Sequence, residues 1–131
     1  MCYYISFAVP SDIERYAHLL LSASLELQPN HNRSFQALVP HTFRTYFLTT
    51  EICSCELYEK TENQMYGFRA DVQHYFHRLS KYTKNIFLHI HFYRSNNEKE
   101  KIPVTSSRSI AIHNMMTTQM DQDCFYQILL K

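Results

Sequence analysis

The chain contains a single glycine, Gly67, and no tryptophan among its 131 residues. Glycine-rich loops of the Walker or Rossmann type need several glycines to let the backbone approach a phosphate, so the sequence excludes both kinds of nucleotide site. Tight two-residue hairpin turns also favour glycine. The turns of this chain are therefore expected to be longer or to use Asn and Asp.

The sequence also has little net charge and no long apolar run. Lysine plus arginine number 13 and aspartate plus glutamate 12, which gives a formal net charge of +1 with neutral histidines. Nucleic-acid binding usually requires a strongly basic domain or stripe, so the overall charge argues against it. No stretch has the length of a membrane span, and the first residues lack the basic start of a signal peptide. We expect a cytoplasmic protein with no membrane span and with its four cysteines reduced.

Apolar residues make up 45% of the chain, with ten Tyr and nine Phe, which is enough to build one hydrophobic core. The length suits a single domain over residues 1–131. Short runs rich in β-branched and aromatic residues predict strands. These runs are residues 2–9, 34–39, 43–57, 86–93, 104–113 and 124–130.

Two segments have helical apolar spacing. Ser11 and Glu14 have the spacing of a capping box and predict a helix over about 12–26. A second amphipathic helix is expected over about 64–83. The element order is then β-α-β-β-α-β-β-β, and the charged run 96–101 is interpreted as a solvated hairpin loop. This pattern predicts an α+β fold with an antiparallel sheet, two helices on one face, and a ferredoxin-like core with extra strands.

The most specific chemical pattern is the pairing of Cys-x-Cys with His-x-His. Cys53 and Cys55 lie two apart on one predicted strand, and His89 and His91 lie two apart on another. Residues two apart on a strand share a face. If the two strands adjoin, the four side chains form a ligand set suited to tetrahedral zinc, and Cys2 could add a third sulfur.

Two other interpretations of these residues stay open. Cysteine is among the most buried residue types, so the cysteines could simply fill a core while the histidines face solvent. A histidine close to Cys53 or Cys55 could instead lower the thiol pKa and give a reactive cysteine.

The outer face of the second predicted helix is the main basic exception to the neutral overall charge. It carries Arg69, His74, His77, Arg78 and Lys81. These side chains could bind an acidic partner or a phosphate, or form an ordinary solvated face. No serine has the flanking glycines of a nucleophile elbow, and no carboxylate pair has useful spacing for acid–base chemistry.

Two hypotheses for function follow from these patterns. The first is a protein-binding module, such as a bacterial immunity or inhibitor protein that neutralises a toxin. It rests on small size, the absence of a catalytic set and abundant tyrosine, a residue favoured at interfaces. The tyrosines could equally surround the core edge. The second hypothesis is a zinc- or thiol-dependent protein that uses the Cys-x-Cys and His-x-His residues.

The first half of the chain resembles a set of small uncharacterised bacterial proteins. The resemblance rests on Met1-Cys2, on Leu38-Val39-Pro40, and on Leu48-Thr49-Thr50 before Cys53-Ser54-Cys55, and it covers residues 1–57. Relatives often continue with Gly-Thr, where this chain has Glu56-Leu57. The resemblance implies no function. It implies that Cys2, Cys53 and Cys55 are spatial neighbours.

Overall fold

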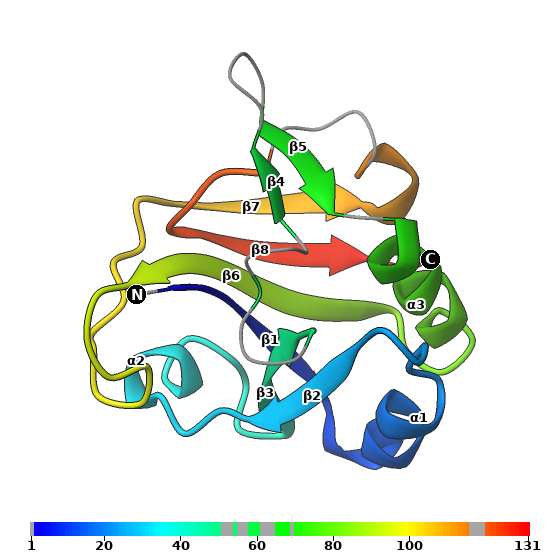
Figure 1. Cartoon of the computed structure of the whole chain (residues 1–131). Coiled ribbons are helices and arrows are strands. Elements are labelled where there is room, and N and C mark those ends of the chain that lie inside the picture. Colours follow the sequence, from blue (N-terminus) through cyan, green and yellow to red (C-terminus); the bar gives the residue numbers. More distant parts are fainter. Residues whose placement is uncertain (1, 51–53, 55–57, 61–64, 69, 116–119) are drawn as a thin grey trace.

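The computed structural model describes residues 2–50, 54, 58–60, 65–68, 70–115 and 120–131. The strands are β1 (Cys2–Pro10), β2 (Glu26–Pro29), β3 (Phe43–Thr49), β4 (Tyr58–Lys60), β5 (Met65–Phe68), β6 (Asn85–Tyr93), β7 (Ser106–Ala111) and β8 (Cys124–Leu129). The helices are α1 (Glu14–Leu19), α2 (Arg33–Gln36) and α3 (Ala70–Leu79), with 3-10 turns at Ser11–Ile13 and Ile112–Asn114. Six strands form one sheet in the order β2-β3-β1-β6-β8-β7, and β4 pairs with β5 (Figure 1).

The fold has the expected mixture of helices and strands, but its sheet is not wholly antiparallel. β1 pairs antiparallel with β3 and with β6, and β6 pairs antiparallel with β8. β7, however, runs parallel to β8, from Ser106 opposite Cys124 to Ala111 opposite Leu129. Side-chain alternation predicts which face a residue takes but not the direction of the neighbouring strand, so the sequence pattern could not reveal this pairing.

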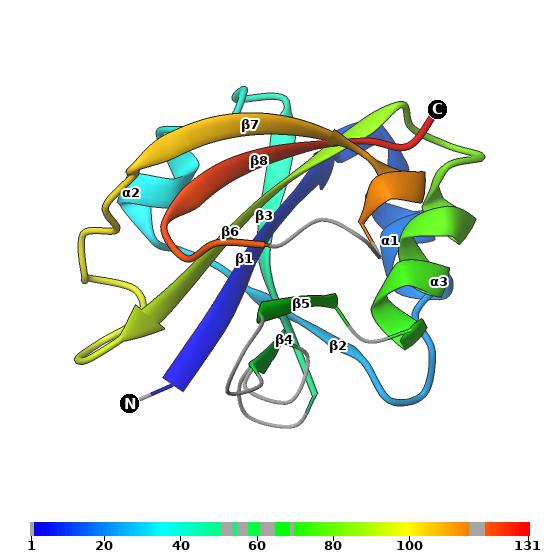
Figure 2. The ribbon, with the colours of Figure 1, turned by 90° about the horizontal axis from the view of Figure 1, so that it is seen from above.

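Two hydrophobic clusters lie on opposite faces of the sheet. Ile86, Leu88 and Ile90 of β6 belong to the larger cluster, together with residues of α1 and α3. Phe87 and Tyr93 of the same strand belong to the smaller cluster, together with α2 and Ile102. We call the two sides the helix face, covered by α1 and α3, and the loop face, covered by α2 and residues 94–105. Figures 1 and 2 show α2 at the opposite end of the molecule from α1 and α3.

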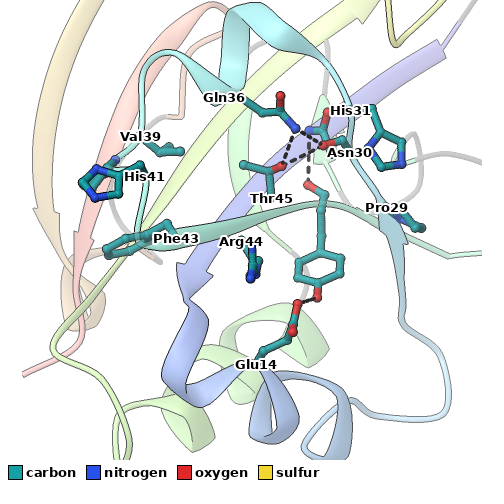
Figure 3. A pocket seen from close by; sticks show the side chains of 12 residues that line it. Glu14, Pro29, Asn30, His31, Gln36, Val39, His41, Phe43, Arg44 and Thr45 are labelled. Atoms are coloured by element: carbon teal, nitrogen blue, oxygen red, sulfur yellow. Dashed lines mark hydrogen bonds between the residues drawn. The ribbon is translucent and has the colours of Figure 1, made fainter.

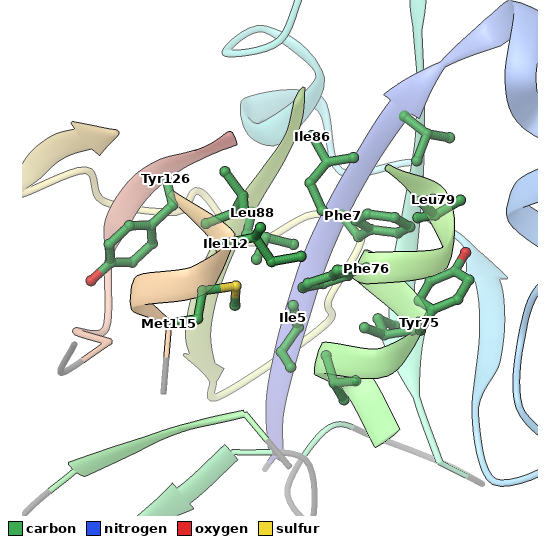
Figure 4. Close-up of a cluster of buried hydrophobic side chains, with 14 of the residues drawn as sticks. Ile5, Phe7, Tyr75, Phe76, Leu79, Ile86, Leu88, Ile112, Met115 and Tyr126 are labelled. Carbon is green, nitrogen blue, oxygen red and sulfur yellow. The ribbon is translucent and has the colours of Figure 1, made fainter. Parts of the chain in front are cut away.

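Aromatic packing joins α3 to β1 on the helix face. The rings of Phe76 and Phe7 stack with centroids 5.7 Å apart, and both side chains are fully buried (Figure 4). The Tyr75 hydroxyl donates a hydrogen bond to the Ala17 carbonyl at 2.5 Å, which ties α3 to α1. Burial raises the pKa of Tyr75, which favours the protonated hydroxyl that donates this bond.

The first predicted helix is much shorter than 12–26. A 3-10 turn follows Pro10, α1 ends at Leu19, and β2 begins at Glu26. The predicted capping box is wrong, because neither the 3-10 turn nor α1 has a side-chain cap. Because a 3-10 turn occupies Ser11–Ile13, Glu14 is the first residue of α1 and not the third residue of a helix capped by Ser11. Its carboxylate accepts a hydrogen bond from the Tyr46 hydroxyl of β3 instead.

Three further elements differ from the sequence prediction. Residues 34–39 form no strand; α2 lies here, and the Asn32 side chain caps it by accepting from the Phe35 amide at 3.0 Å. The second helix begins at Ala70, because Met65–Phe68 pairs with β4 as a strand. Aromatic residues favour strands and Gly67 disfavours a helix, which accounts for the later start. β3 ends at Thr49, so the predicted strand 43–57 is also too long.

Within the described residues, no helix has the length and apolar character that crossing a membrane requires.

Candidate functional site

The two histidines of His-x-His lie on the loop face of β6. The strand that precedes Cys-x-Cys, β3, does not adjoin β6, because β1 lies between them. The adjacency on which the four-residue zinc set depends is therefore not met between β3 and β6. Cys53 and Cys55 lie outside the described residues, and the described Cys2 lies on β1 opposite Tyr93. Among the described residues, no group of three or more His, Cys, Asp or Glu side chains could hold a metal ion.

Ser54, the residue between the two cysteines, lies against β1. Its amide donates to the Tyr3 carbonyl at 2.9 Å, and its hydroxyl accepts from the Ile5 amide at 2.8 Å. The same hydroxyl donates to the Leu48 carbonyl. Ser54 therefore bonds to the backbone of β1 at the point where the pairing of β1 with β3 ends. This explains why a serine is fully buried here.

His91 lies between two carboxylates. Its Nδ1 is 2.6 Å from Asp123 Oδ1, and its Nε2 is 2.6 Å from Glu100 Oε2. Glu100 comes from the segment after β6, and Asp123 directly precedes β8. Asp123 has a positive φ of 59° and is held there by two backbone bonds, from its amide to Ile90 and from Thr105 to its carbonyl. Three separate segments thus meet at one imidazole.

His89 has a different environment two residues earlier. It is fully buried, and its Nε2 contacts the Pro103 carbonyl at 2.8 Å. Its Nδ1 makes no hydrogen bond within the described part of the chain. Burial lowers the pKa of His89, and the nearby Pro103 carbonyl and Asp123 only partly oppose that effect. The ring is therefore neutral, with its proton on Nε2. The alternative interpretation that both histidines face solvent is wrong.

A surface hollow of about 530 Å³ lies beside His91. Tyr3 and Phe92 form an aromatic side of it, with ring centroids 5.0 Å apart. Arg94 and Lys101 also line the hollow, and neither forms an ion pair with any described residue. The hollow combines polar and aromatic groups, but it contains no nucleophile next to a general base.

A second hollow, of about 510 Å³, lies between the end of β2, α2 and β3 (Figure 3). Tyr46 also lines this hollow, and its hydroxyl donates to Glu14 and lies 3.2 Å from His18 Nε2. Burial, followed by the hydrogen bond to Glu14, raises the pKa of Tyr46. A tyrosine whose ionisation is suppressed in this way acts as a structural connector between α1 and β3 rather than as an acid or base at neutral pH.

The predicted basic face of α3 is only partly free to meet a partner. His74, His77 and Lys81 are exposed. Arg78 is half-buried, and its Nε donates to the Leu20 carbonyl at 3.0 Å, so it also fastens α3 to the end of α1. Arg69 lies outside the described residues.

The sequence analysis missed an exposed apolar group beside that face. Tyr16 of α1 and Tyr82, just after α3, stack in parallel with centroids 4.0 Å apart. Leu19 is 65% exposed, the most exposed large apolar side chain among the described residues. We call Tyr16, Leu19 and Tyr82 the Tyr16 patch. The predicted helix over 12–26 gave no sign of this group, because α1 ends at Leu19 and Tyr82 comes from a distant segment.

Comparisons of this chain with protein-family models, with curated proteins and with solved structures found no match. The resemblance over residues 1–57 therefore stays a prediction.

Proposed function

We propose that the protein is a protein-binding module that holds an acidic partner on the Tyr16 patch. The observation that carries the proposal is a pair of exposed stacked tyrosines beside a leucine that is 65% exposed. Aromatic residues surrounded by polar ones are typical of the centre of a protein interface. Exposing apolar area of this kind to water is unfavourable, and free energy is gained when a partner covers it.

Charge gives the chemistry of the partner. Arg15 precedes Tyr16, and Lys81 precedes Tyr82; both are exposed and form no ion pair with any residue that the structure describes. The nearby carboxylate of Glu14 is engaged by Tyr46. The patch therefore has a basic rim, and a partner with an apolar side chain flanked by carboxylates would complement it. His77 and Arg78 extend the same rim.

The narrower proposal is that the partner is a toxin and the protein its immunity or inhibitor protein. Small size supports it, together with the lack of a nucleophile–base pair in either hollow described above. We also propose that β2-β3-β1-β6 is a ferredoxin-like core. The antiparallel pairing of these strands supports it, and so do α1 and α3 on one face. Each helix lies in a connection between two strands that are separated by one other strand in the sheet.

The second candidate is a zinc- or thiol-dependent protein that uses Cys53, Cys55, His89 and His91. One observation favours it: Ser54 is bonded to β1, the strand that carries Cys2. The histidines are less suited to it, since both nitrogens of His91 contact carboxylates and Nε2 of His89 contacts a carbonyl. Zinc content of the purified protein decides the matter, and a value far below one zinc per chain would remove the metal hypothesis.

Site-specific photo-crosslinking tests partner binding. A photoreactive amino acid replaces Leu19 in one variant and Val104, which is 39% exposed, in a matched control. In source cells we expect a protein adduct from position 19 and none from position 104. Adding Arg15→Glu and Lys81→Glu should reduce the adduct at least tenfold. Equal adducts from both positions, or an adduct that nuclease removes, would contradict the proposal; the second outcome would indicate nucleic acid instead.

A further inference from the structure

The contacts of His91 fix its protonation state. A neutral imidazole has one N–H donor and one acceptor nitrogen, whereas an ionised carboxylate only accepts. Both nitrogens of His91 are 2.6 Å from carboxylate oxygens, one from Asp123 and one from Glu100. Both contacts are hydrogen bonds only if both nitrogens carry a proton. The ring in this arrangement is therefore an imidazolium between two carboxylates.

Glu100 links His91 to the segment that covers the loop face. Its second carboxylate oxygen accepts from the amides of Arg94 and Ser95, at 3.1 and 3.0 Å, and from the Ser95 hydroxyl at 2.9 Å. Although burial raises it, these bonds and the one from His91 lower the pKa of Glu100 to about 2. Glu100 is therefore ionised at neutral pH.

Several other charged or titratable groups face His91. On β6 the rings of His89 and Tyr93 lie with centroids 6.2 and 4.6 Å from that of His91. From β1, Tyr4 is the cross-strand neighbour of His91, and Tyr3 lines the same hollow. From the segment after β6, Arg94 and Lys101 line that hollow with Glu100. The two carboxylates contact the ring directly, whereas the two cations are exposed, so the carboxylates dominate.

We propose that His91 is a proton-operated latch that closes residues 94–105 onto the sheet. With its proton, the ring binds Glu100 and Asp123 together. When the second ring proton leaves for solvent, one nitrogen can only accept, and it faces a carboxylate that also only accepts. One of the two bonds is then lost. The latch is closed while the ring carries both protons and opens when one of them leaves.

The second attachment of this segment limits how far it moves. The Asn32 side-chain amide donates to the carbonyls of Asn97 and Glu100, at 2.9 and 2.8 Å. The Ile102 amide donates to the Ser34 hydroxyl at 3.0 Å. These neutral bonds to α2 do not respond to the proton. Opening therefore loosens the link between Glu100 and β6 and widens the hollow beside His91, while the segment stays attached to α2.

NMR of the whole chain between pH 5 and pH 9 tests the latch. Nitrogen-15 spectra of the imidazoles report whether each ring carries one proton or two. We expect two on His91 at pH 5. When His91 loses its proton, amide exchange at Arg94 and Ser95, corrected for its intrinsic pH dependence, should accelerate about tenfold to a hundredfold, the range for a hydrogen bond to a charged group.

Two variants separate the latch from general loosening. His91→Gln cannot change its charge, so the Arg94 and Ser95 amides should lose their pH response. Glu100→Gln keeps an acceptor for those amides, should lose the same response, and covers the case in which His91→Gln fails to fold. Glu98→Gln, an exposed carboxylate on the same segment, should behave as the wild type. A single proton on His91 at pH 5 overturns the proposal, and so does an unchanged pH response in both Glu100→Gln and His91→Gln.

Discussion

The two faces of one sheet are built by different means, although the same strands supply both. On the helix face, Ile86, Leu88 and Ile90 of β6 meet the aromatic residues of α3 in a continuous apolar cluster. On the loop face β6 presents Phe87 and Tyr93 to the smaller apolar cluster, with His89 and His91 between them. The partners of the two histidines are carboxylates and a carbonyl. The helix face depends mainly on the burial of apolar area, whereas the loop face combines a smaller apolar cluster with specific hydrogen bonds.

The difference shows how the short helix α2 can still be held on the loop face. α2 has only four residues, and it contributes one fully buried aromatic, Phe35. So small a helix buries too little area to be stable alone, because helices shorter than about 12 residues are marginal in water. Polar contacts through Asn32 and Glu100 supply the remaining constraint. Such contacts depend on geometry and on charge, whereas apolar packing depends mainly on volume.

The largest effect is expected on the helix face. Phe76→Ala removes a fully buried ring that stacks on Phe7, and it should lower the free energy of unfolding by about 3–5 kcal/mol. Urea denaturation measures the change. Val104→Ala, at a position 39% exposed, should change it by less than about 0.5 kcal/mol. A loss below about 1 kcal/mol for Phe76→Ala would mean that the helix face is not the main source of stability.

Asn32→Ala should have the next largest effect, on the loop face. It removes the cap of α2 and both bonds to the segment after β6, with an expected loss of about 2–3 kcal/mol. Asn32→Ser retains a capping oxygen but has no amide donor. Denaturation of the two variants side by side separates the cap from the anchor. If both variants are as stable as the wild type, hydrogen bonds do not hold this cover.

Acid should weaken the loop face through His89 and Glu100, in the opposite direction to the His91 latch. Burial lowers the pKa of His89 from the unfolded value of 6.5, so the folded state binds fewer protons and stability falls as pH falls through that value. Glu100, with a pKa of about 2 against 4.5, adds a further loss between those two values. One group contributes at most about 1.4 kcal/mol per pH unit.

Unfolding free energies at pH 7, 5.5 and 4 measure this dependence. His89→Gln has no titratable ring, so its stability should change less between pH 7 and 5.5 than that of the wild type. An identical slope in both proteins would assign the acid sensitivity to other groups.

The smallest effect concerns the polar connector at the edge of the helix face. Tyr46→Phe removes the hydroxyl that contacts Glu14 and His18, and it should cost about 1 kcal/mol, because both partners can still meet water. Tyr82→Phe, at an exposed tyrosine, is the matched control and should be neutral. Thermal unfolding followed by circular dichroism is sufficient. A neutral Tyr46→Phe would show that the Tyr46 hydroxyl does not help to hold α1.

The sequence predicted the strongly patterned elements well. β1, β6 and β8 agree closely with the predicted strands 2–9, 86–93 and 124–130, because each is a run of apolar and β-branched or aromatic residues. The body of α3 followed from its helical spacing. The short elements were wrong because their identity depends on distant contacts. Local spacing suggested that Glu14 belongs to a capping box. In the structure its carboxylate accepts a hydrogen bond from Tyr46, 32 residues away, which local spacing cannot indicate.

The environment of the histidines could not be predicted from the sequence pattern for a similar reason. Period-two spacing placed His89 and His91 on one face, and that inference is correct. It could not indicate which groups cover that face, since Glu100 and Asp123 lie 9 and 32 residues from His91. The run 96–101 was interpreted as a solvated hairpin loop. β6 and β7 are not neighbours, and Glu100 within that run turns inward to the sheet.

The placement of β8 has a consequence for the order of events during synthesis. β8 follows β7 in the chain yet lies between β7 and β6, so β7 has no neighbour in the sheet until residues 124–129 arrive. A nascent chain that stops short of this strand would expose the open edge of β6, the kind of edge that recruits strands from other molecules. Completion of this half of the sheet must therefore wait until the ribosome has released residue 129.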